Sequence, residues 1–482
     1  MKTFKIISSI GLLCLFFTGS AFGQNYFDAL RYNFYNPGSD PINIGMAGSV
    51  VANKSGLGTA SENPAAIGLF KHSVISFDLS SRNVSEDATY LGVKNNFNKS
   101  QTGISNAGII YKMPTLRGSM VFGATYNQIT DFNRAFKINA QNNQNSITEF
   151  FNQNSFYHDI AYQGFALDST SSGGTESVLR LAQNGFQGIN QYSEVKESGQ
   201  MGEYSIFGAA EFQKNLYLGA ALAFPVADYK YHRSFLERDL NNVYQTYPYN
   251  VKNIDSEDKI HDKLTGFYAR IGFVYKVMPW LNIAGSYRTK SKMKIKETYL
   301  STVSTTFDDG QSYNSKNSDG NGMINYDVTS PGRLTLGASI VDMSGLNVNG
   351  SVEYVDYSKI TMSIPTDKSY EITQNTNIQN SFQQVWNYSI GASYRIGSIV
   401  PRIGYAHYPS PRKTFDAART YYSAGLGIGM SKGIMLNIGV QMATWKDNVV
   451  LYSVATNSGT NNMTATENVH HLNAMKGLRF AF

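Results

Sequence analysis

The stretch Gly45–Phe70, GMAGSVVANKSGLGTASENPAAIGLF, is the part of the chain from which the fold can be argued. It is rich in glycine, alanine and serine, and its apolar residues follow neither the helical nor the strand period. Small residues let one stretch of backbone pass close to another, and Asn63-Pro64 and Ile67-Gly68 are turn signals. Such a compact apolar segment has to be buried by another structure, and we expect the rest of the chain to enclose it.

Residues 1–23 have the pattern of a signal peptide. Lys2 and Lys5 precede the apolar run Ile6–Phe17, and small residues follow it, just before an expected cleavage site. The run is shorter than a comfortable transmembrane helix. Cleavage would also remove Cys14, the only cysteine of the chain. We therefore expect an exported protein without disulfides or thiol chemistry.

The composition is typical of strands that face lipid on one side and a polar interior on the other. Aromatic residues make up 13% of the chain, with 32 tyrosines and 28 phenylalanines but only 12 prolines. After the signal peptide no apolar run is long enough for a membrane helix, which favours membrane strands. The net charge of +6 is spread along the chain, so it does not indicate a nucleic-acid partner.

Strand-like alternation begins at Ser73–Ser80, where Ile75, Phe77 and Leu79 alternate with polar residues. The same period recurs to the end of the chain and predicts about fourteen strands. The predicted strands are 73–82, 104–112, 117–130, 204–213, 216–235, 261–277, 281–300, 323–341, 346–360, 383–396, 399–408, 420–430, 434–444 and 469–482.

The connections between these strands are alternately short and long. Short turns are expected near 113–116, 214–215, 278–280, 342–345, 397–398 and 431–433. Long polar loops are expected near 83–103, 131–203, 236–260, 301–322, 361–382, 409–419 and 445–468. Tight turns at one end and long loops at the other are typical of an outer-membrane barrel, and closure leaves no strand edge exposed to lipid. A soluble sandwich would seldom place every long loop at one end. An even number of strands puts both chain ends at the short-turn end.

The last strand supports this interpretation. Its apolar residues fall on one face, which Lys476 interrupts, and the chain ends on an aromatic residue, as in the assembly signal of outer-membrane barrels. The residues on that face are Leu472, Ala474, Leu478, Phe480 and Phe482.

Asn63-Pro64-Ala65, with Gly45–Gly48 before it and Gly68-Leu69 after it, resembles the amino-terminal hatch of the FadL/TodX-type outer-membrane transporters. The segments Asp28–Tyr32 and Ser330–Leu334 resemble the Bacteroidetes branch of that family. This sequence has Asn-Pro-Ala-Ala where members often have Asn-Pro-Ala-Gly, and its third long loop is unusually long.

The resemblance implies an all-β fold, a transmembrane antiparallel β-barrel of about 14 strands in the outer membrane of a Gram-negative bacterium. Residues 24–72 would form a hatch, or plug, inside the lumen. Residues 73–482 would form the barrel, with long extracellular loops that are partly helical over 131–203. Family members carry long-chain fatty acids or aromatic hydrocarbons, which outer loops catch and which leave sideways through a defect in a strand.

Asn63, Pro64 and Ala65 are the candidate gating residues of the hatch. The residue before a proline is held away from the helical region, and asparagine readily bonds to nearby backbone. The turn could rearrange to open the lumen, or it could be a static turn that fixes the plug. The sequence favours neither.

The long segment 131–203 contains two predicted helices. Ser146 and Glu149 form a capping-box pattern, which places Phe150 and Phe151 on or near one helical face. Thr175–Asn184 is the second predicted helix, with Val178 and Leu179 on one face and Gly185 at its end. The four apolar residues Phe150, Phe151, Val178 and Leu179 are candidate ligand-binding residues in an apolar groove. Alternatively, the two helices simply pack on each other or on neighbouring loops.

No catalytic, metal or cofactor site is expected. Gly425–Gly429 is rich in glycine but lies inside a predicted strand, so it is not a phosphate loop. Asn317–Gly322 resembles the start of a calcium loop, but Val328 stands where the acidic ligand would be needed. His470 and His471 are adjacent in a strand and would face opposite ways.

The sequence therefore predicts passive transport of hydrophobic small molecules, such as long-chain fatty acids or similar lipids and hydrocarbons. Its expected partners are the outer-membrane bilayer and a hydrophobic ligand. The alternative is a barrel of similar architecture that takes part in secretion or surface attachment and whose outer loops bind a secreted protein. An enzyme, for example a barrel lipase, would need a serine, a histidine and an acid together, and no pattern nominates them.

Overall fold

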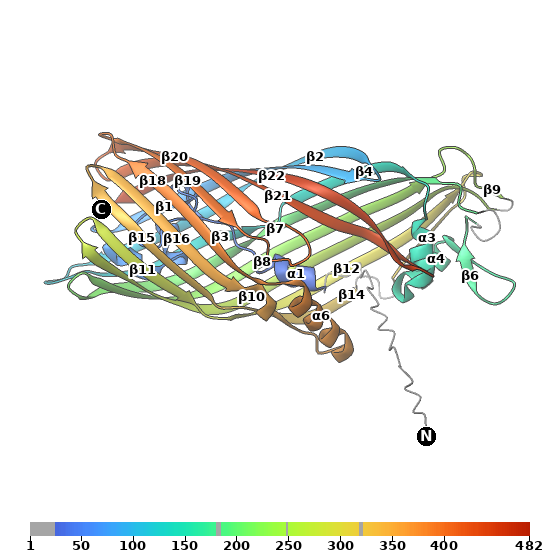
Figure 1. The fold of residues 1–482 in the computed structure, drawn as a ribbon, viewed down its shortest axis with the longest axis horizontal. Coiled ribbons are helices and arrows are strands. Elements are labelled where there is room, and N and C mark those ends of the chain that lie inside the picture. Colours follow the sequence, from blue (N-terminus) through green and yellow to red (C-terminus); the bar gives the residue numbers. More distant parts are fainter. Residues whose placement is uncertain (1–24, 180–184, 247–248, 318–321) are drawn as a thin grey trace, which may run out of the picture.

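A computed structural model describes residues 25–179, 185–246, 249–317 and 322–482 of the chain. The expected signal peptide, with Cys14, lies outside the described residues. The described chain is a tall antiparallel β-barrel whose lumen holds the N-terminal segment, residues 25–72 (Figure 1). None of the described helices combines the length and apolar character needed to cross a bilayer.

Within the described residues the wall has fourteen positions, some of them built by two consecutive strands. In order around the wall they are β1 (Val74–Tyr90), β2 (Val93–Met113), β3 (Met120–Asp131) with β4 (Arg134–Asn142), β7 (Ile189–Gln213), β8 (Leu216–Arg238), β10 (Tyr249–Met278), β11 (Leu281–Arg288) with β12 (Ser291–Phe307), β14 (Gly322–Ser330) with β15 (Arg333–Met343), β16 (Leu346–Asp356), β18 (Gln384–Tyr394), β19 (Ile399–Tyr408), β20 (Arg419–Ser431), β21 (Ile434–Thr456) and β22 (Gly459–Ala481).

The wall closes where the last strand pairs with the first. β22 runs antiparallel to β1 from the pair Val74 and Ala481 to the pair Thr89 and Thr466. At the foot of this ladder the Phe482 N–H donates to the Ser73 carbonyl at 3.0 Å, and the Ser73 N–H donates back at 3.1 Å. Lipid offers no hydrogen bonds to an open edge, so this ladder satisfies the backbone on both sides of the seam. The predicted fold class is confirmed.

The remaining elements lie in the lumen or at the long-loop end. The helices are α1 (Tyr26–Arg31), α2 (Pro41–Ile44), α3 (Ile147–Gln153), α4 (Ser155–Gln163) and α6 (Lys368–Ser381), and the 3₁₀ helices are η1 (Leu57–Ser61), η2 (Pro64–Leu69) and η3 (Tyr357–Lys359). The short strands are β5 (Leu167–Ser169), β6 (Thr175–Ser177), β9 (Gln245–Thr246), β13 (Ser312–Lys316) and β17 (Thr361–Ser363).

Several predicted loops are wrong, because they are continuations of wall strands. β1 and β2 extend through the predicted loop 83–103, and β21 and β22 extend through most of 445–468. The same holds for much of 236–260, where β8 and β10 pair. In these parts the outward side chains are polar, for example Asn83 and Ser85, because the wall there has water on its outside. Sequence reasoning misinterpreted this polarity as a loop signal.

Nearer the short turns, the outward face carries an apolar belt of large exposed hydrophobic side chains. Ile75, Phe77 and Leu79 on β1, Ile206 on β7 and Phe224 on β8 belong to it. The outward position of the first three confirms the predicted alternation. Lys476 is exposed on the same face of β22 as Leu472 and Leu478, as its parity indicates.

The N-terminal segment runs down the lumen from the long-loop end. Its first helix, α1, lies beside α6 (Figure 1), and the Tyr26 N–H donates to the Gln374 side chain of α6 at 3.0 Å. Farther on, α2 packs on β20 and β21, and η2 packs on β7, β8 and β10 near the short turns. The expectation that both ends lie at the short-turn end is therefore wrong for the described chain. Phe482 lies there, whereas Asn25 lies beside α6.

An arginine placed in the apolar belt should destabilise the barrel. We expect Ile206→Arg to lower the free energy of unfolding by about 2–4 kcal/mol, because the new charge faces the bilayer interior. Asn98→Arg is the matched control, since Asn98 is exposed on β2 above the belt. Urea titration of the barrel in lipid vesicles measures both. Equal losses in the two variants would contradict this assignment of the belt.

Candidate functional site: three levels of the lumen

The lowest level of the lumen is the turn at Asn63, Pro64 and Ala65. Asn63 is extended, with φ −149° and ψ 107°, as expected before a proline. Its side-chain oxygen accepts from the Ala65 N–H at 3.0 Å. Its side-chain amide donates to the carbonyls of Val51 at 2.9 Å and of Phe273 on β10 at 3.1 Å. One side chain thus ties the N-terminal segment to itself and to the wall.

Two wall glycines allow this turn to touch the barrel. A Cβ atom at Gly219 of β8 would lie 2.4 Å from the Ala65 nitrogen, and one at Gly272 of β10 would lie 2.0 Å from the Asn63 side-chain oxygen. Both distances are far inside van der Waals contact. The segment and the wall therefore meet with no room for a side chain between them at this level.

The middle level is a charged layer around a cavity of about 60 Å³, room for roughly two waters. Six charged residues line it: Glu62, Glu203, Arg270, Arg288, Arg333 and Glu353. Arg270 pairs with Glu203 at 3.2 Å, and Arg333 pairs with Glu353 at 2.8 Å. The layer is small and polar, so it does not suit a hydrophobic ligand.

Glu62 is the member of this layer that the N-terminal segment contributes. Burial, followed by the nearby carboxylate of Glu353, raises the pKa of Glu62 from its ordinary value of 4.5 to about 8. The carboxyl group is therefore predominantly protonated at neutral pH. Ionising it would place an additional negative charge between the segment and the wall.

The upper level is a pocket of about 150 Å³. It combines aromatic rings with guanidinium groups, and its lining includes Phe27, Phe34, Phe132, Trp445, Arg31, Arg134, Arg412 and Arg419. Such a lining can hold an apolar body and bind an acidic head group.

Most of the arginines in this pocket already have carboxylate partners. Arg134 lies 2.8 Å from Asp447 and also pairs with Glu86 and Glu467. Arg412 lies 2.8 Å from Asp447 as well.

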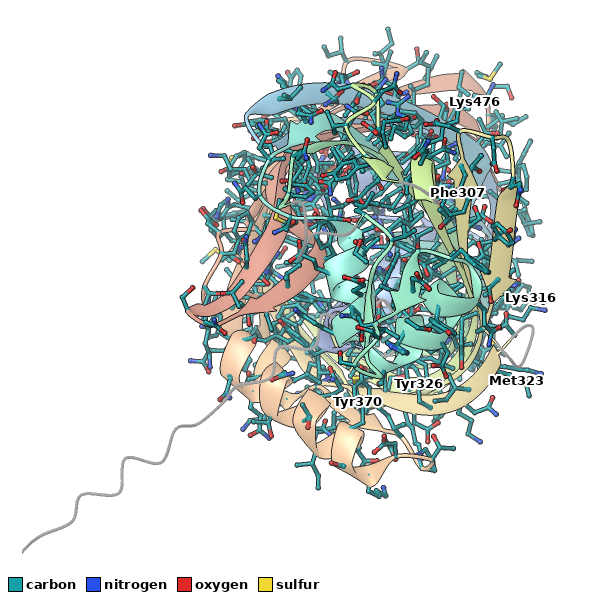
Figure 2. The ribbon with its side chains drawn as sticks, turned by 90° about the vertical axis from the view of Figure 1, so that its right-hand side faces the viewer. Phe307, Lys316, Met323, Tyr326, Tyr370 and Lys476 are labelled. Carbon is teal, nitrogen blue, oxygen red and sulfur yellow. The ribbon has the colours of Figure 1, made fainter. Side chains whose placement is uncertain are left out.

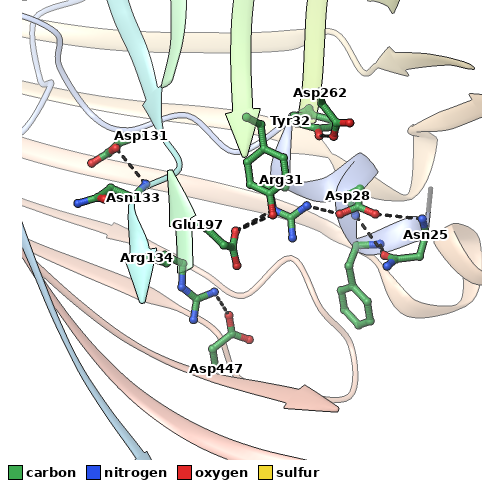
Figure 3. Close-up of polar contacts among 12 residues, drawn as sticks. Asn25, Asp28, Arg31, Tyr32, Asp131, Asn133, Arg134, Glu197, Asp262 and Asp447 are labelled. Atoms are coloured by element: carbon green, nitrogen blue, oxygen red, sulfur yellow. Dashed lines mark hydrogen bonds and ion pairs between the residues drawn. The ribbon is translucent and has the colours of Figure 1, made fainter. Parts of the chain in front are cut away.

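On the N-terminal side, Arg31 lies 3.3 Å from Glu197 and also pairs with Asp28 (Figure 3). Arg419 differs, because among the described residues no ion pair joins it to a carboxylate. Its guanidinium lies over the rings of Phe34 at 3.7 Å and Trp445 at 4.3 Å.

The wall beside this pocket has a break in its ladder. The ladder between β2 and β3 ends at the pair Asn106 and Asn127. Farther toward the long-loop end, β4 pairs with β7 on one side and with no other described strand on its other side. The Arg82 side chain lies at the break, where it donates to the Gln200 side chain at 3.2 Å and lies 3.4 Å from Asp131. Here side chains rather than backbone bonds close the wall.

The predicted ligand-binding residues Phe150, Phe151, Val178 and Leu179 lie together in one hydrophobic cluster at the mouth, each less than a tenth exposed. Figure 2 shows α3 and α4 seated within the mouth of the barrel. In this arrangement the four side chains are packed within the cluster, and a ligand would reach them only after the helices move. Their role in binding stays a prediction.

The local predictions for this segment have mixed outcomes. The capping box of Ser146 and Glu149 begins α3, as predicted. The predicted helix Thr175–Asn184 is wrong at its start, where Thr175–Ser177 forms β6 and pairs with β5; residues 180–184 lie outside the described residues. Sequence reasoning missed α4, although Asn154 caps it with its side chain.

The glycine run lies in the wall, and one of the two adjacent histidines is ion-paired. Gly425–Gly429 lies within β20, as predicted, and Gly425 lies directly against Gly45. His471 pairs with Asp131 at 3.0 Å. Most of the calcium-like stretch lies outside the described residues. Across the ranges that the structure describes, no group of three or more potential metal ligands comes together.

A closed barrel with a plugged lumen and a ladder break defines a class, the outer-membrane transport barrel. Residues 204–482 match the model of one family, outer membrane protein transport protein (OMPP1/FadL/TodX). This match spans more than half of the chain, so the chain belongs to that family. It is a transport barrel of the Gram-negative outer membrane, not an enzyme.

Solved structures have the same fold at low sequence identity. The toluene transporter TbuX of Ralstonia pickettii is 16% identical, with a TM-score of 0.53 over 92% of this chain and 99% of that one. TodX of Pseudomonas putida is 11% identical, with a TM-score of 0.54 over 92% and 99%. A FadL homologue of Pseudomonas aeruginosa is 11% identical, with a TM-score of 0.57 over 93% and 100%. A comparison with curated protein sequences finds no match.

A methyl group at Gly219 should loosen the lower level. We expect Gly219→Ala to displace Ala65, at a cost of about 1–3 kcal/mol for overpacking, and to raise the ion conductance of the barrel in planar bilayers. Gly350→Ala is the matched control, because the nearest atom to a Cβ there is 4.0 Å away. Equal conductance in Gly219→Ala and wild type would contradict a tight contact at this level.

Glu62 should make stability depend on pH. Between pH 4.5 and about 8 the folded state keeps a proton that the unfolded state has lost, so stability falls as pH rises. We expect Glu62→Gln to raise the melting temperature at pH 9 and to leave it unchanged at pH 4. Glu371→Gln, on α6, should show no such gain, because the Glu371 carboxylate accepts from the Ile364 N–H and pairs with Lys368. Heat-dependent gel mobility measures the transition, and a Glu62→Gln gain at pH 4 as large as at pH 9 would be inconsistent with a buried, protonated carboxyl.

Proposed function

We propose that this barrel passively carries hydrophobic small molecules with an acidic head, such as long-chain fatty acids or similar lipids. The upper pocket is the observation that carries the proposal. It combines aromatic walls with one guanidinium, that of Arg419, which has no carboxylate partner among the described residues. A ligand carboxylate would supply that partner.

The charge pattern around the pocket supports an acidic ligand over a basic one. Asp447 and Glu197 are already paired with arginines, so they would compensate a cation poorly. Arg419 lies in a water-poor aromatic setting, where a charge-assisted hydrogen bond is strong. The rings of Phe34 and Trp445 would contact the first carbons of the tail.

The upper pocket is too small to hold a whole long-chain ligand. At about 150 Å³ it holds roughly the volume of one benzene ring. A long tail therefore needs more room than the upper pocket provides. We infer that the tail leaves through the ladder break beside Asp131, or that the hatch residues Asn63, Pro64 and Ala65 move to release it below. The outer loops, with α3 and α4, would admit the ligand from outside.

The test compares an acidic and a neutral probe on Arg419→Gln. We expect this variant to bind palmitate about tenfold more weakly, because one charge-assisted hydrogen bond is lost, and to bind toluene as the wild type does. Tryptophan fluorescence of the purified barrel measures binding, and entry of labelled palmitate into vesicles measures transport.

Arg238→Gln is the matched control for that test. Arg238 is also a cation over a ring, that of Tyr192, but it lies on the outward-facing side of β8. The control should bind both probes normally. If the wild-type barrel neither binds palmitate nor speeds its entry into vesicles, the proposal is contradicted and the secreted-protein alternative is favoured.

A further inference from the structure

The outer wall carries a set of lysines at the upper boundary of the apolar belt on one side of the barrel. On β12 the residues Lys292, Lys294 and Lys296 are all exposed, while the alternating residues Met293 and Ile295 are buried. Period two therefore puts the three ammonium groups on the outward face. They span roughly 13 Å along the strand, from the rise per residue.

Neighbouring segments add two more lysines to this surface. Lys263 of β10 is exposed directly opposite Lys296 in the antiparallel register. Lys290 is exposed in the connection between β11 and β12. We call these five residues the lysine ladder: Lys263, Lys290, Lys292, Lys294 and Lys296. Its strands run side by side along the wall (Figure 1).

The ladder is under-compensated within the protein. Lys292 pairs with Asp327 of β14 at 2.8 Å. Asp228 of β8, which is opposite Lys263, is engaged by His261 at 2.8 Å and Lys230 at 3.9 Å. No ion pair joins the other four ladder lysines to a carboxylate among the described residues.

The pair Lys263 and Lys296 is the least expected feature of the ladder. Side chains directly opposite in an antiparallel pair lie about 5 Å apart at Cβ, and like charges there are destabilising. The protein keeps two positive charges where a neutral residue would have been easier to accommodate. An anion outside the wall would remove this repulsion.

The position of the ladder identifies where that anion comes from. Phe267 follows Lys263 on the outward face of β10, with Thr265 between them; it is exposed in the apolar belt and lies opposite Lys292 in the register. Its ring lies 5.3 Å from that of Phe224, also in the belt. The ladder thus starts level with the upper boundary of the belt, at Lys290 and Lys292, and continues from there toward the long-loop end. Lysine side chains are long enough to reach head groups from either side of that boundary.

We propose that the lysine ladder binds the phosphate groups of outer-leaflet glycolipid head groups. Acyl chains of the same lipid molecule would lie on the belt around Phe224 and Phe267, and its phosphates would contact the ladder. Anionic head groups attract clusters of lysines next to a membrane surface. The site is separate from the lumen, so it makes no use of the transport pocket.

The test measures binding of diphosphorylated lipid A to the purified full-length barrel in neutral detergent. Native mass spectrometry gives the occupancy. We expect Lys292→Gln, Lys294→Gln and Lys296→Gln together to weaken binding about tenfold or more. The corresponding triple arginine variant should keep wild-type binding, because it keeps the charges. Added salt should weaken wild-type binding.

A matched control removes the same charge elsewhere. Lys71, Lys214 and Lys432 are exposed at the short-turn end, and their triple glutamine variant should bind as the wild type does. Two further probes separate the sources of phosphate: lipid A without phosphates should bind weakly, and inorganic phosphate should not displace the intact lipid.

Three outcomes would overturn the proposal: equal loss in both glutamine variants, equal binding of the dephosphorylated lipid, or displacement by inorganic phosphate at concentrations comparable to those of the lipid. Gel mobility checks that each variant folds. If the ladder variant does not fold, the wild-type comparison of phosphorylated and dephosphorylated lipid, with its salt dependence, decides the question alone.

Discussion

The hydrogen-bonded ladder that joins β22 to β1 is the constraint on which the rest of the structure depends. In a bilayer an unpaired strand edge would leave a row of polar groups without partners, so the sheet has to close. Once it closes, every wall residue is directed either to lipid or to the lumen. The apolar belt, the charged lumen and the place of the N-terminal segment are all consequences of that division.

The lumen is the harder part of the structure to stabilise, because inward-facing charges are removed from water. The chain addresses this by pairing them across strands, as with Arg270 and Glu203 or Arg134 and Asp447. The N-terminal segment fills the remaining space with small residues below and with aromatic rings above. Among the four arginines of the upper pocket, Arg419 is the one that no ion pair joins to a carboxylate within the described residues, and its guanidinium lies instead over the rings of Phe34 and Trp445.

The parts of the fold that could be predicted were those encoded by neighbouring residues. Alternation placed Phe77 and Leu478 on the outward face, and the capping box placed the start of α3. The errors arose where polarity was ambiguous. Asn83 and Ser85 are polar because their strand rises above the bilayer, and the same residue types also mark loops. The helix expected to begin at Thr175 does not begin there, because these residues form the strand β6, which pairs with β5.

The sequence by itself determined a closed barrel in the outer membrane, the number of wall positions and the turn at Asn63. It could do so because these features depend on residue period and local turn chemistry. Only the tertiary structure decided which residues of the N-terminal segment meet which residues of the wall. Ala65 meets Gly219, and Arg419 meets Phe34, across long separations in sequence. Those contacts depend on the register of the strands around the whole barrel and on the direction in which the N-terminal segment enters the lumen. Neither can be predicted from a local sequence pattern.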